Sequence, residues 1–462
     1  MSLAGPPPVS TNPLALLFED LRAERRVTVP FPPGPTRPSM IRTQRFAGDP
    51  LHVLLELYER YGPVFTIRIF HGNSVFALGP EANHYITVSH AHNFSWRGGH
   101  MGDLIPLLGD GLLTIDGDFH RRSRKVMLPA FHRERIEAAQ LIIEEEATAA
   151  VGRLRAGQEL DLYHWTRALA LRVAMRALFG LRPERPQPGG LDAAETFEEA
   201  LSFWARAYHL QILRGPGTPW RKMQRARAQL DELIFEEIRR RRSSGERGED
   251  ILSLLLDAED EDGRHLSERH VRDEVMTLLF AGHDTTTSTV AFLFYELARN
   301  PHVLDEDAFD LAQAIDETLR LYPPAWIGPR RSIEPFELAG VQVPGGVPVN
   351  YCSWASHHLP DVWEDPEAFR PDRFAPANRE RIPKGAYVPF GGGSRTCIGM
   401  RFGLAEVTVI ARTLLERFRL DLRPGYRLEI RQMPTISPKR GLPMTLRAAS
   451  APPGALDTKA AA

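Results

Sequence analysis

The residues best suited to chemistry form a glycine-rich loop around one cysteine, Phe390-Gly-Gly-Gly-Ser-Arg-Thr-Cys397-Ile-Gly399. Its glycines would let the backbone approach a flat, bulky group. A helix expected directly after the loop would point its amide dipoles at the sulfur, which favours a thiolate over a thiol. One thiolate is too few ligands for a zinc or iron–sulfur site, but it is enough for the proximal position of a haem iron. The other cysteine, Cys352, lacks these surroundings and is expected to be a small buried apolar side chain.

A second cluster, Ala281-Gly-His-Asp-Thr-Thr286, lies in the middle of a long stretch without proline. Two small residues beside a run of hydroxyls predict a local weak point, where side chains compete for backbone carbonyls and bend a helix. By itself the cluster could be a packing notch. Beside a reactive cysteine it has a second interpretation, because a hydroxyl next to a carboxylate can relay protons. His283 is expected on the helix surface and not as a ligand.

These two stretches resemble the motifs of the cytochrome P450 family. The haem-binding loop of the family, FxxGxRxCxG, is matched in full by Phe390, Gly393, Arg395, Cys397 and Gly399. The resemblance implies that Cys397 is the axial thiolate ligand of haem b, and that the cofactor is also bound by Phe390, Arg395 and Gly399. The upstream cluster matches the oxygen-activation motif AGx(D/E)T(T/S). That match implies that Thr285 is the catalytic hydroxyl and Asp284 the catalytic acid.

Two further motifs of the family follow in the expected order. Glu317-Thr-Leu-Arg320 matches ExxR, and Phe369-Arg-Pro-Asp-Arg373-Phe374 matches FxPxRF. An acid and an arginine three apart share one helix face, and most such pairs are ordinary solvated ones. The resemblance implies instead that Glu317, Arg320 and Arg373 form a buried structural network that supports the haem loop, so that losing one charge would strand the others.

Haem propionates need cationic or hydrogen-bonding partners when they are buried. The resemblance offers His120 and Arg124, four residues apart, together with Arg395 and Arg330; adjacent Arg331 is the rival of Arg330. The neighbouring basic side chains of the same segment have two interpretations, a solvated face or a docking patch for an acidic electron carrier. They are Arg121, Arg122 and Lys125.

The elements that must position these residues are mostly helical. Ser267 to Arg299 predicts the longest helix, opened by a serine cap and closed before Asn300 and Pro301, and its 33 residues would span roughly 50 Å. Other helices are expected near 51–62, 119–131, 133–156, 164–180, 193–213, 220–243, 249–258 and 399–418, with β segments at 64–70, 74–78, 336–349, 426–430 and 443–447. The fold class is therefore mainly α with small β-sheets (α+β), and the resemblance implies the cytochrome P450 fold, with a long central helix over a haem held by a cysteine loop.

The resemblance covers residues 30–447, which we expect to be a single haem domain. Residues 1–29 are expected to be an N-terminal extension and 448–462 a disordered tail, because the tail lacks core-forming residues. One departure from most relatives is the short segment between Pro301 and Glu317. It is expected to trim a helix beside the proximal face and so to affect partner docking.

Composition excludes several other classes of function. Lys and Arg total 57 against 59 Asp and Glu, so the net charge of −2 does not suit a nucleic-acid binder. Two cysteines cannot form a disulfide framework, which fits a reducing, cytoplasmic setting. The first apolar run, 14–18, is too short for a transmembrane anchor, which needs roughly 20 residues.

The resemblance implies a soluble haem-thiolate monooxygenase that inserts one atom of O2 into a lipophilic substrate. No flavin or iron–sulfur segment follows the haem-binding region, so electrons are expected from NAD(P)H indirectly, through a separate ferredoxin or flavodoxin and its reductase. One alternative is a peroxide-using peroxygenase or isomerase on the same scaffold, which has less need of Asp284 and Thr285. Another is a non-catalytic haem sensor or carrier, which leaves the proton relay unexplained.

The substrate pocket is expected to be mainly apolar, since its candidate segments are rich in aliphatic and aromatic side chains. This suits a fatty acid, a terpenoid or a steroid-like molecule and does not choose among them. The candidate lining residues, by position, are Trp96, Ala281, Ala325, Ile327 and Ile436.

Overall fold

The computed structural model describes residues 6, 9–69, 72–180, 193–204, 206, 208–245, 248, 250–259, 263, 265–305 and 309–450. The chain divides into two compact units, each built from separate segments. The first comprises Met1–Arg121, Ala325–Ala368 and Pro376–Cys397; the second comprises Arg122–Pro324, Phe369–Ala375 and Ile398–Ala462. The predicted domain boundaries stay a prediction, and residues 451–462 of the predicted disordered tail lie outside the described residues.

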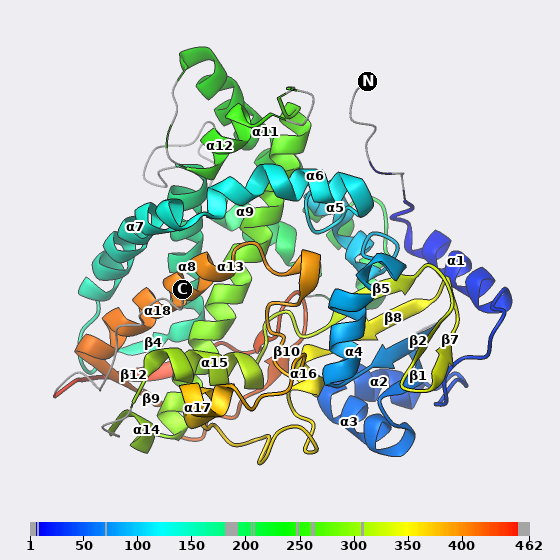
Figure 1. Ribbon diagram of the computed structural model, residues 1–462. Helices are drawn as coiled ribbons and strands as arrows, with labels where there is room; N and C mark the ends of the chain where they lie inside the picture. Colours follow the sequence, from blue (N-terminus) through cyan, green and yellow to red (C-terminus); the bar gives the residue numbers. More distant parts are fainter. Residues whose placement is uncertain are drawn as a thin grey trace. The chain divides into compact units, whose positions relative to one another are not determined.

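A five-stranded sheet organises the first unit (Figure 1). Its order is β1 (Val64–Ile69), β2 (Gly72–Ala77), β8 (Pro348–Tyr351), β5 (Gly328–Ser332) and β3 (Phe94–Ser95). Strand β2 pairs in parallel with β8, and the other three neighbouring pairs are antiparallel. A hairpin of β6 (Phe336–Leu338) and β7 (Val341–Val343) packs its apolar side chains into the same core as those of β2, β3 and β8.

The helices of the first unit are short. They are α1 (Pro13–Arg25), α2 (Met40–Gly48), α3 (Pro50–Tyr61), α4 (Pro80–His84), α5 (Ile105–Leu108), α16 (Ser353–Ser356) and α17 (Pro376–Arg379). A π-helical turn, Tyr85–Ser89, extends α4. Helix α6 (Gly117–Met127) carries the chain from the first unit into the second.

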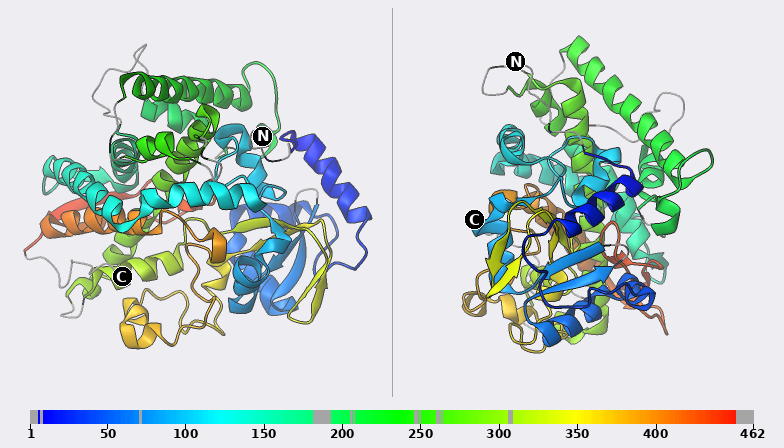
Figure 2. Two further views of the ribbon diagram at one scale, coloured as in Figure 1. Left: turned by 45° about the horizontal axis from the view of Figure 1, so that its top comes forward. Right: turned by 90° about the vertical axis from the view of Figure 1, so that its right-hand side faces the viewer.

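Helices dominate the second unit, as the two views of Figure 2 show. They are α7 (Arg133–Gly152), α8 (Leu162–Val173), α9 (Ala193–Leu201), α10 (Tyr208–Gln211), α11 (Pro219–Ser244), α12 (Ile251–Asp257), α13 (Glu268–Arg299), α14 (His302–Asp305), α15 (Leu311–Leu321) and α18 (Met400–Arg417). Two small sheets complete the unit. One has the order β4 (Glu159–Asp161), β12 (Pro443–Ala448), β9 (Phe418–Leu422), and the other pairs β10 (Ile430–Arg431) with β11 (Ser437–Pro438).

The longest described helix, α13, forms the axis of the second unit, with α8, α15 and α18 packed against it. Ser267 caps it by accepting a hydrogen bond from the His270 amide, and Asn300 follows its last turn. Its 32 residues, Glu268–Arg299, agree with the helix predicted from the sequence over Ser267 to Arg299. The structure therefore gives the hydroxyl cluster a rigid, buried support.

Some elements differ from the expectation. The helix expected over 193–213 ends at Leu201, and the described part of 202–213 contains only the short α10. The segment 336–349 is a hairpin followed by β8 and not one strand, because Ala339 and Gly340 reverse the chain with positive φ angles. Strand β5 was not expected, since its sequence Gly-Pro-Arg-Arg-Ser lacks an apolar alternation. Among the helices of the described residues, none is long and apolar enough to span a bilayer.

Candidate active site

The cysteine loop of the first unit is held closed by its own backbone. The Cys397 amide donates to the Phe390 carbonyl at 2.9 Å, and a 3₁₀ turn, Gly393–Arg395, lies between them. Gly391 and Gly393 have φ angles of 70° and 61°, which favour glycine. A Cβ on Gly393 would lie 2.2 Å from the Thr87 carbonyl oxygen, and one on Gly392 would lie 2.6 Å from the Thr87 hydroxyl. These two glycines are therefore required by packing on the π-helical turn, a reason that the sequence did not reveal.

The two cysteines differ in their surroundings. Cys352 is fully buried at the N-cap of α16, where its sulfur accepts a hydrogen bond from the Ala355 amide. Burial raises the pKa of the Cys352 thiol to about 12. Cys397 is exposed at the end of the loop. Cys352 stays a thiol near neutral pH, so Cys397 is the cysteine suited to serve as a thiolate ligand.

Two arginines of the first unit lie over the Trp96 ring, and a third, Arg97, is its neighbour in the sequence. The Arg330 guanidinium lies 3.6 Å from the centre of the Trp96 ring and that of Arg395 lies 4.9 Å from it. Arg395 pairs with Asp116 at 2.8 Å and donates to backbone carbonyls, and Arg97 pairs with Asp110 at 2.9 Å. Arg330 is 3% exposed and forms no ion pair with any carboxylate of the described residues. It is the buried cation of this group that still lacks a negative partner.

The other candidate cations have different settings. Arg331 pairs with Asp20 and donates to the carbonyls of Gly98 and Gly346, so its positive charge is already compensated by a carboxylate. This favours Arg330 over Arg331 as an anion-binding residue. His120 is buried and Arg124 half-buried, both on α6.

The Glu317 cluster lies within the second unit. Arg320 donates to both Glu317 carboxylate oxygens at 2.8 and 2.9 Å, and Arg373 approaches Oε1 at 3.3 Å. The Arg370 backbone amide adds a further bond to Oε1 at 3.0 Å. Glu317 and Arg320 are fully buried. The structure thus brings together the three residues of the predicted network, and adds a backbone donor that the sequence motif did not indicate.

The hydroxyls of α13 bond back to their own helix. Thr285 donates to the Ala281 carbonyl at 2.8 Å, and Thr287 and Thr289 donate in the same way to residues one turn earlier. Thr286 points elsewhere and donates to the Glu406 carboxylate of α18 at 3.1 Å. The helix remains continuous through this region, and the competition with backbone carbonyls that the sequence predicts is present.

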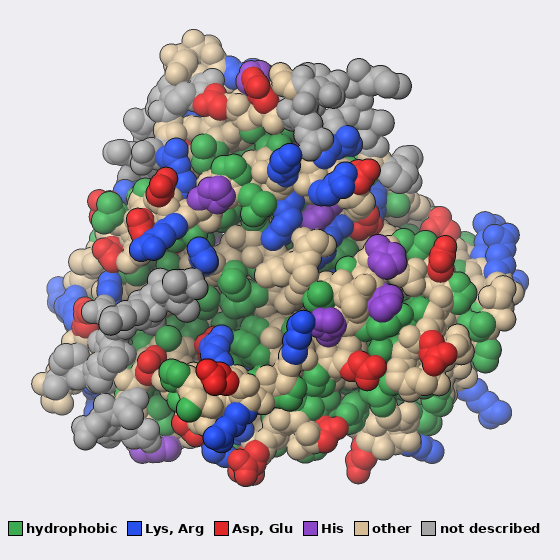
Figure 3. All heavy atoms as spheres, in the orientation of Figure 1, with side chains coloured by type: hydrophobic (Ala, Val, Ile, Leu, Met, Phe, Trp, Pro, Cys, Tyr) green, Lys and Arg blue, Asp and Glu red, His purple; other side chains and the backbone are tan. Residues whose placement is uncertain are grey.

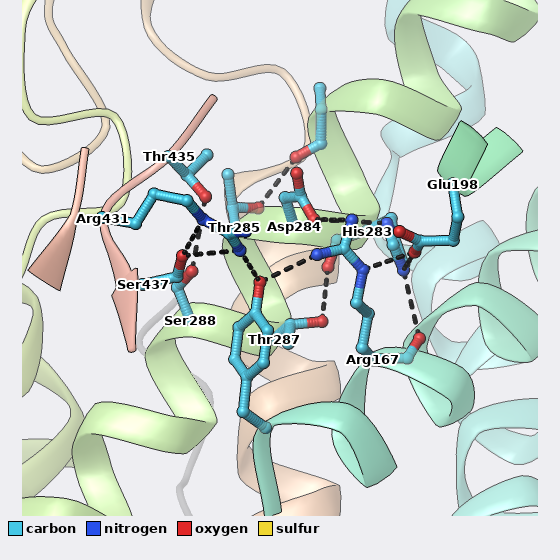
Figure 4. A network of polar contacts seen from close by, with 12 residues as sticks. Arg167, Glu198, His283, Asp284, Thr285, Thr287, Ser288, Arg431, Thr435 and Ser437 are labelled. Carbon is cyan, nitrogen blue, oxygen red and sulfur yellow. Dashed lines mark hydrogen bonds and ion pairs between the residues drawn. The ribbon is translucent and has the colours of Figure 1, made fainter. Parts of the chain in front are cut away.

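Asp284 lies in a buried cluster of charged groups, shown in Figure 4. Arg167 of α8 approaches Asp284 Oδ1 at 3.1 Å and also pairs with Glu198 of α9. The His283 side chain lies between the two carboxylates. The expectation that His283 lies on the helix surface is wrong: its side chain is fully buried, packed edge-on against Phe197 at 5.8 Å. Burial lowers the pKa of its imidazole, against a smaller opposing effect of Asp284.

Sequence reasoning missed several residues of these sites. Arg167 and Glu198 are ordinary helical charges in sequence, and they are more than 80 positions before Asp284, so no local spacing marks them. Glu406 stands in an apolar stretch of α18, and a carboxyl in such a stretch is a usable signal. Asp116, which binds Arg395 and the amides of Trp96 and Arg97, carries no motif.

The residues predicted to line the substrate pocket are dispersed along the chain. Trp96 and Ile327 are half-buried and Ala325 exposed in the first unit, whereas Ala281 is half-buried and Ile436 buried in the second. The second unit holds an apolar cavity of about 40 Å³ against α13, which none of these residues lines. Ligand pockets are usually about 300–1,000 Å³, so this cavity does not replace the predicted pocket. Its lining includes Leu171, Met175, Phe197, Leu230, Val275 and Leu279.

A cysteine loop, a hydroxyl cluster on a long helix and a saturated Glu317 cluster together define a protein of the haem-thiolate class. The model of the family described as Cytochrome P450 matches residues 30–306 and 311–443. The chain belongs to the cytochrome P450 family.

Relatives and solved structures agree with this assignment. The chain is 34% identical over 433 residues to the cyclooctat-9-en-7-ol 5-monooxygenase of Streptomyces melanosporofaciens, with 87% of this chain and 92% of the relative covered. It is 33% identical to the cyclooctatin synthase of the same organism, with 73% and 79% covered. Among solved structures it is similar to the retinoic acid-bound cyanobacterial CYP120A1, with a TM-score of 0.80, 28% identity, and 91% of this chain and all of that chain covered.

Family membership supplies the reaction class. Members hold a haem iron through a cysteine thiolate and use O2, so this chain is an oxidoreductase of the monooxygenase type. The first unit fits that cofactor on two observations. Cys397 is exposed in its closed loop, and Arg330 is a buried cation with no carboxylate partner in the described chain, as an anionic propionate requires.

Proposed function

We propose that this chain hydroxylates a largely hydrocarbon substrate, an unsaturated cyclic alcohol or a similar lipophilic molecule, with Cys397 as the iron ligand. The observation that carries the proposal is the contrast between the two cysteines, because the Cys352 sulfur is fully buried and accepts a hydrogen bond from the Ala355 amide, whereas Cys397 is exposed at the end of its loop. The substrate class is supported by the relative named for cyclooctat-9-en-7-ol, of which the chain covers 92%.

The chemistry that a thiolate-ligated haem supplies when bound is the insertion of one atom of O2 into a C–H bond, with the other atom leaving as water. Cys397 would supply the negatively charged thiolate that binds the iron. Arg330 holds one carboxylate of the cofactor, and His120, Arg124 and Arg395 assist. Phe390 and Gly399 complete the loop around the ligand.

Asp284 and Thr285 handle protons. Asp284 lies in a site almost closed to water, and with the neighbouring Thr285 hydroxyl it forms an acid–hydroxyl pair that can relay protons. In the resting helix this hydroxyl donates to the Ala281 carbonyl at 2.8 Å. The Thr285 hydroxyl must break this hydrogen bond before it can donate to another group. The Glu317 cluster does not take part in these steps, and its role is to hold its own region rigid.

Electrons come from NAD(P)H through a separate ferredoxin or flavodoxin and its reductase. Figure 3 shows Lys and Arg side chains gathered over α6, where Arg121 and Lys125 are exposed. An acidic electron carrier would be steered to such a patch.

The test begins with the absorption spectrum of the reduced protein under carbon monoxide. A Soret band strongly shifted to the red is expected for the wild type and for Cys352→Ala, and its loss is expected for Cys397→Ala. A histidine-type spectrum in fresh wild type, or an unchanged spectrum in Cys397→Ala, would contradict the proposal. Substrate class is then tested by spectral titration with fatty acids, steroids and unsaturated cyclic alcohols, and by mass spectrometry for a product gaining one oxygen. Turnover with peroxide alone that equals turnover with the reductase system would favour the peroxygenase alternative.

A further inference from the structure

The small cavity beside α13 has walls that offer no hydrogen bonds to water. Its volume is about 40 Å³, and ten of its eleven described lining residues are apolar. The eleventh is Glu237 of α11, whose carboxylate accepts hydrogen bonds from Arg240 at 2.8 Å and from Arg241 at 2.6 Å. A buried water needs about two to four polar partners, and apolar cavities without such partners stay dry. The cavity is therefore suited to an apolar occupant.

The size of the cavity limits that occupant to a few atoms. Helices α8, α9, α11, α12 and α13 all contribute to its walls, and Phe197, Leu252 and Val275 are at most 2% exposed. The cavity is larger than the roughly 10–15 Å³ that one water molecule needs. It is far smaller than the roughly 300–1,000 Å³ of pockets for drug-sized ligands. A lipophilic substrate does not fit, whereas a small gas molecule does.

Dioxygen meets both requirements. It is uncharged and has no permanent dipole, so it gains dispersion contacts in apolar surroundings and loses no hydrogen bonds on leaving water. Xenon, which is also apolar, binds to dry cavities of other proteins. Dioxygen is a reactant for members of the cytochrome P450 family, to which this chain belongs.

The wall residue Leu279 lies between the cavity and the hydroxyl motif of α13. Residues three and four positions apart are neighbours on a helix surface, so Leu279 adjoins Gly282 and His283. Phe197 lines the cavity and packs against His283 at 5.8 Å, which closes that side. An added Cβ at Gly282 would meet no described atom beyond its own stretch of helix within 4 Å. Space is therefore open beside Gly282, and Thr285 adjoins it three positions further on.

We propose that this cavity is a binding site for dioxygen, from which the molecule moves along α13 past Leu279 toward Thr285. This rests on the proposed function, because dioxygen reacts only when haem is bound. At 1.5 Å per residue, Leu279 and Thr285 are about 9 Å apart along the helix axis, so the path is short. The movement forms and breaks no covalent bond, and it requires the Leu279 side chain to change rotamer.

The first test is xenon binding to the holoenzyme, followed by xenon NMR as the gas pressure is raised. Val275→Phe fills the cavity from its α13 wall. We expect xenon binding to weaken about tenfold or more, because no space remains for the dispersion contacts of the gas. Val275→Ile adds a single methyl group, and a smaller fall in the same direction is expected. The test therefore survives if the phenylalanine variant fails to fold.

Val290→Ile is the matched control, because Val290 is also buried on α13 and is not among the residues that line the cavity. It is expected to bind xenon as the wild type does. Equal xenon binding by the wild type and all three variants overturns the proposal.

The second test distinguishes dioxygen from other apolar molecules. Stopped-flow absorption measures the dioxygen association rate of the reduced holoenzyme in the wild type, Val275→Phe and Leu279→Phe. We expect both variants to slow association by about threefold or more, since the first removes the site and the second narrows the path. Val290→Ile should leave the rate unchanged. In turnover, the KM for dioxygen should rise and the KM for the organic substrate should not.

An unchanged association rate in both variants overturns the proposal. A raised KM for the organic substrate alone also overturns it, because the cavity would then take a small hydrocarbon part of that substrate. Xenon binding does not depend on the iron ligand. Its failure is therefore distinct from loss of the carbon monoxide signature, which tests the proposed function.

Discussion

Two buried ion clusters of the second unit differ in how completely their carboxylates are bonded. Glu317 receives bonds from Arg320 at 2.8 and 2.9 Å, from the Arg370 amide at 3.0 Å and from Arg373 at 3.3 Å. Asp284 is equally buried, yet within the described chain it receives a charge contact and no hydrogen bond. Hydrogen bonds hold a fully bonded carboxylate in one position, whereas a carboxylate without them is held less firmly and keeps its oxygens available to other partners. The first arrangement suits a structural role and the second suits proton transfer.

The largest effect on stability is expected at the saturated cluster. Glu317→Gln removes the charge that compensates Arg320, whose side chain is fully buried. Breaking such a pair leaves an uncompensated buried charge, so the free energy of unfolding should fall by about 3–5 kcal/mol. Urea unfolding of the purified protein measures it.

Glu416→Gln is the control for that experiment, since Glu416 is half exposed and lies 3.9 Å from Arg412. Its effect should stay within about 0.5 kcal/mol. Equal effects in the two variants would remove the distinction between the clusters.

At the Asp284 cluster we expect a large effect on turnover and a smaller effect on stability. Asp284→Asn removes the acid and its ion pair with Arg167, which keeps Glu198 as a partner, so the free energy of unfolding should fall by less than in Glu317→Gln. Turnover should fall by about 10²–10⁴-fold, the usual contribution of a positioned acid. Product formation and urea unfolding, measured on one preparation, separate the two quantities. A loss of stability that equals that of Glu317→Gln would assign Asp284 to the structural class.

The sequence indicated the spacing of the residues in these clusters far better than how completely their carboxylates are bonded. Glu317, Arg320 and Arg373 lie in short motifs, and helical spacing alone places the first two on one face. The bonding state of Asp284 depends on Arg167 and Glu198, which reach it through the packing of α8 and α9 on α13. Such long-range contacts leave no local pattern, and for the same reason the burial of His283 was missed.

Strand β5 and the loop glycines are likewise determined by contacts with residues distant in the sequence. The sequence Gly-Pro-Arg-Arg-Ser has no strand periodicity, and its pairing with β8 decides its conformation. The glycine at 393 was expected to face a bulky group, and its closest neighbour is the backbone of Thr87. Long periodic helices such as α13 were predictable because their signals are local.

The Glu406 carboxyl is bonded less completely than that of Glu317 and more completely than that of Asp284. It is 2% exposed, one oxygen accepts from Thr286 and the other has no partner in the described structure. Burial raises the pKa of Glu406 to about 8, so the folded protein holds a proton that the unfolded chain, with a pKa near 4.5, releases. The stabilisation is full below pH 4.5 and is lost as the pH rises to about 8.

Glu406→Gln removes this dependence, because the amide stays neutral. Relative to this variant, the wild type should lose about 1.4 kcal/mol of unfolding free energy per pH unit between pH 5 and 8, with no further loss above that range. Urea unfolding of both proteins at several pH values tests it. Parallel curves for the two proteins would mean that Glu406 is ionised when folded.

The smallest effect on stability is expected at an exposed ion pair. Arg121 lies 3.1 Å from Asp118 on α6, and both side chains are at least 75% exposed. Arg121→Gln should change the unfolding free energy by about 0.5 kcal/mol or less, since water and salt screen such pairs. If α6 docks an acidic electron carrier, the same substitution should slow association with a ferredoxin, most strongly at low salt. Stopped-flow reduction at two ionic strengths measures the association rate. Arg133→Gln is the control, because Arg133 also belongs to an exposed ion pair, 2.8 Å from Glu137. Equal association rates in the two variants would show that Arg121 is an ordinary solvated charge and does not bind the electron carrier. The charged residues important for function would then be the buried, incompletely bonded carboxylates.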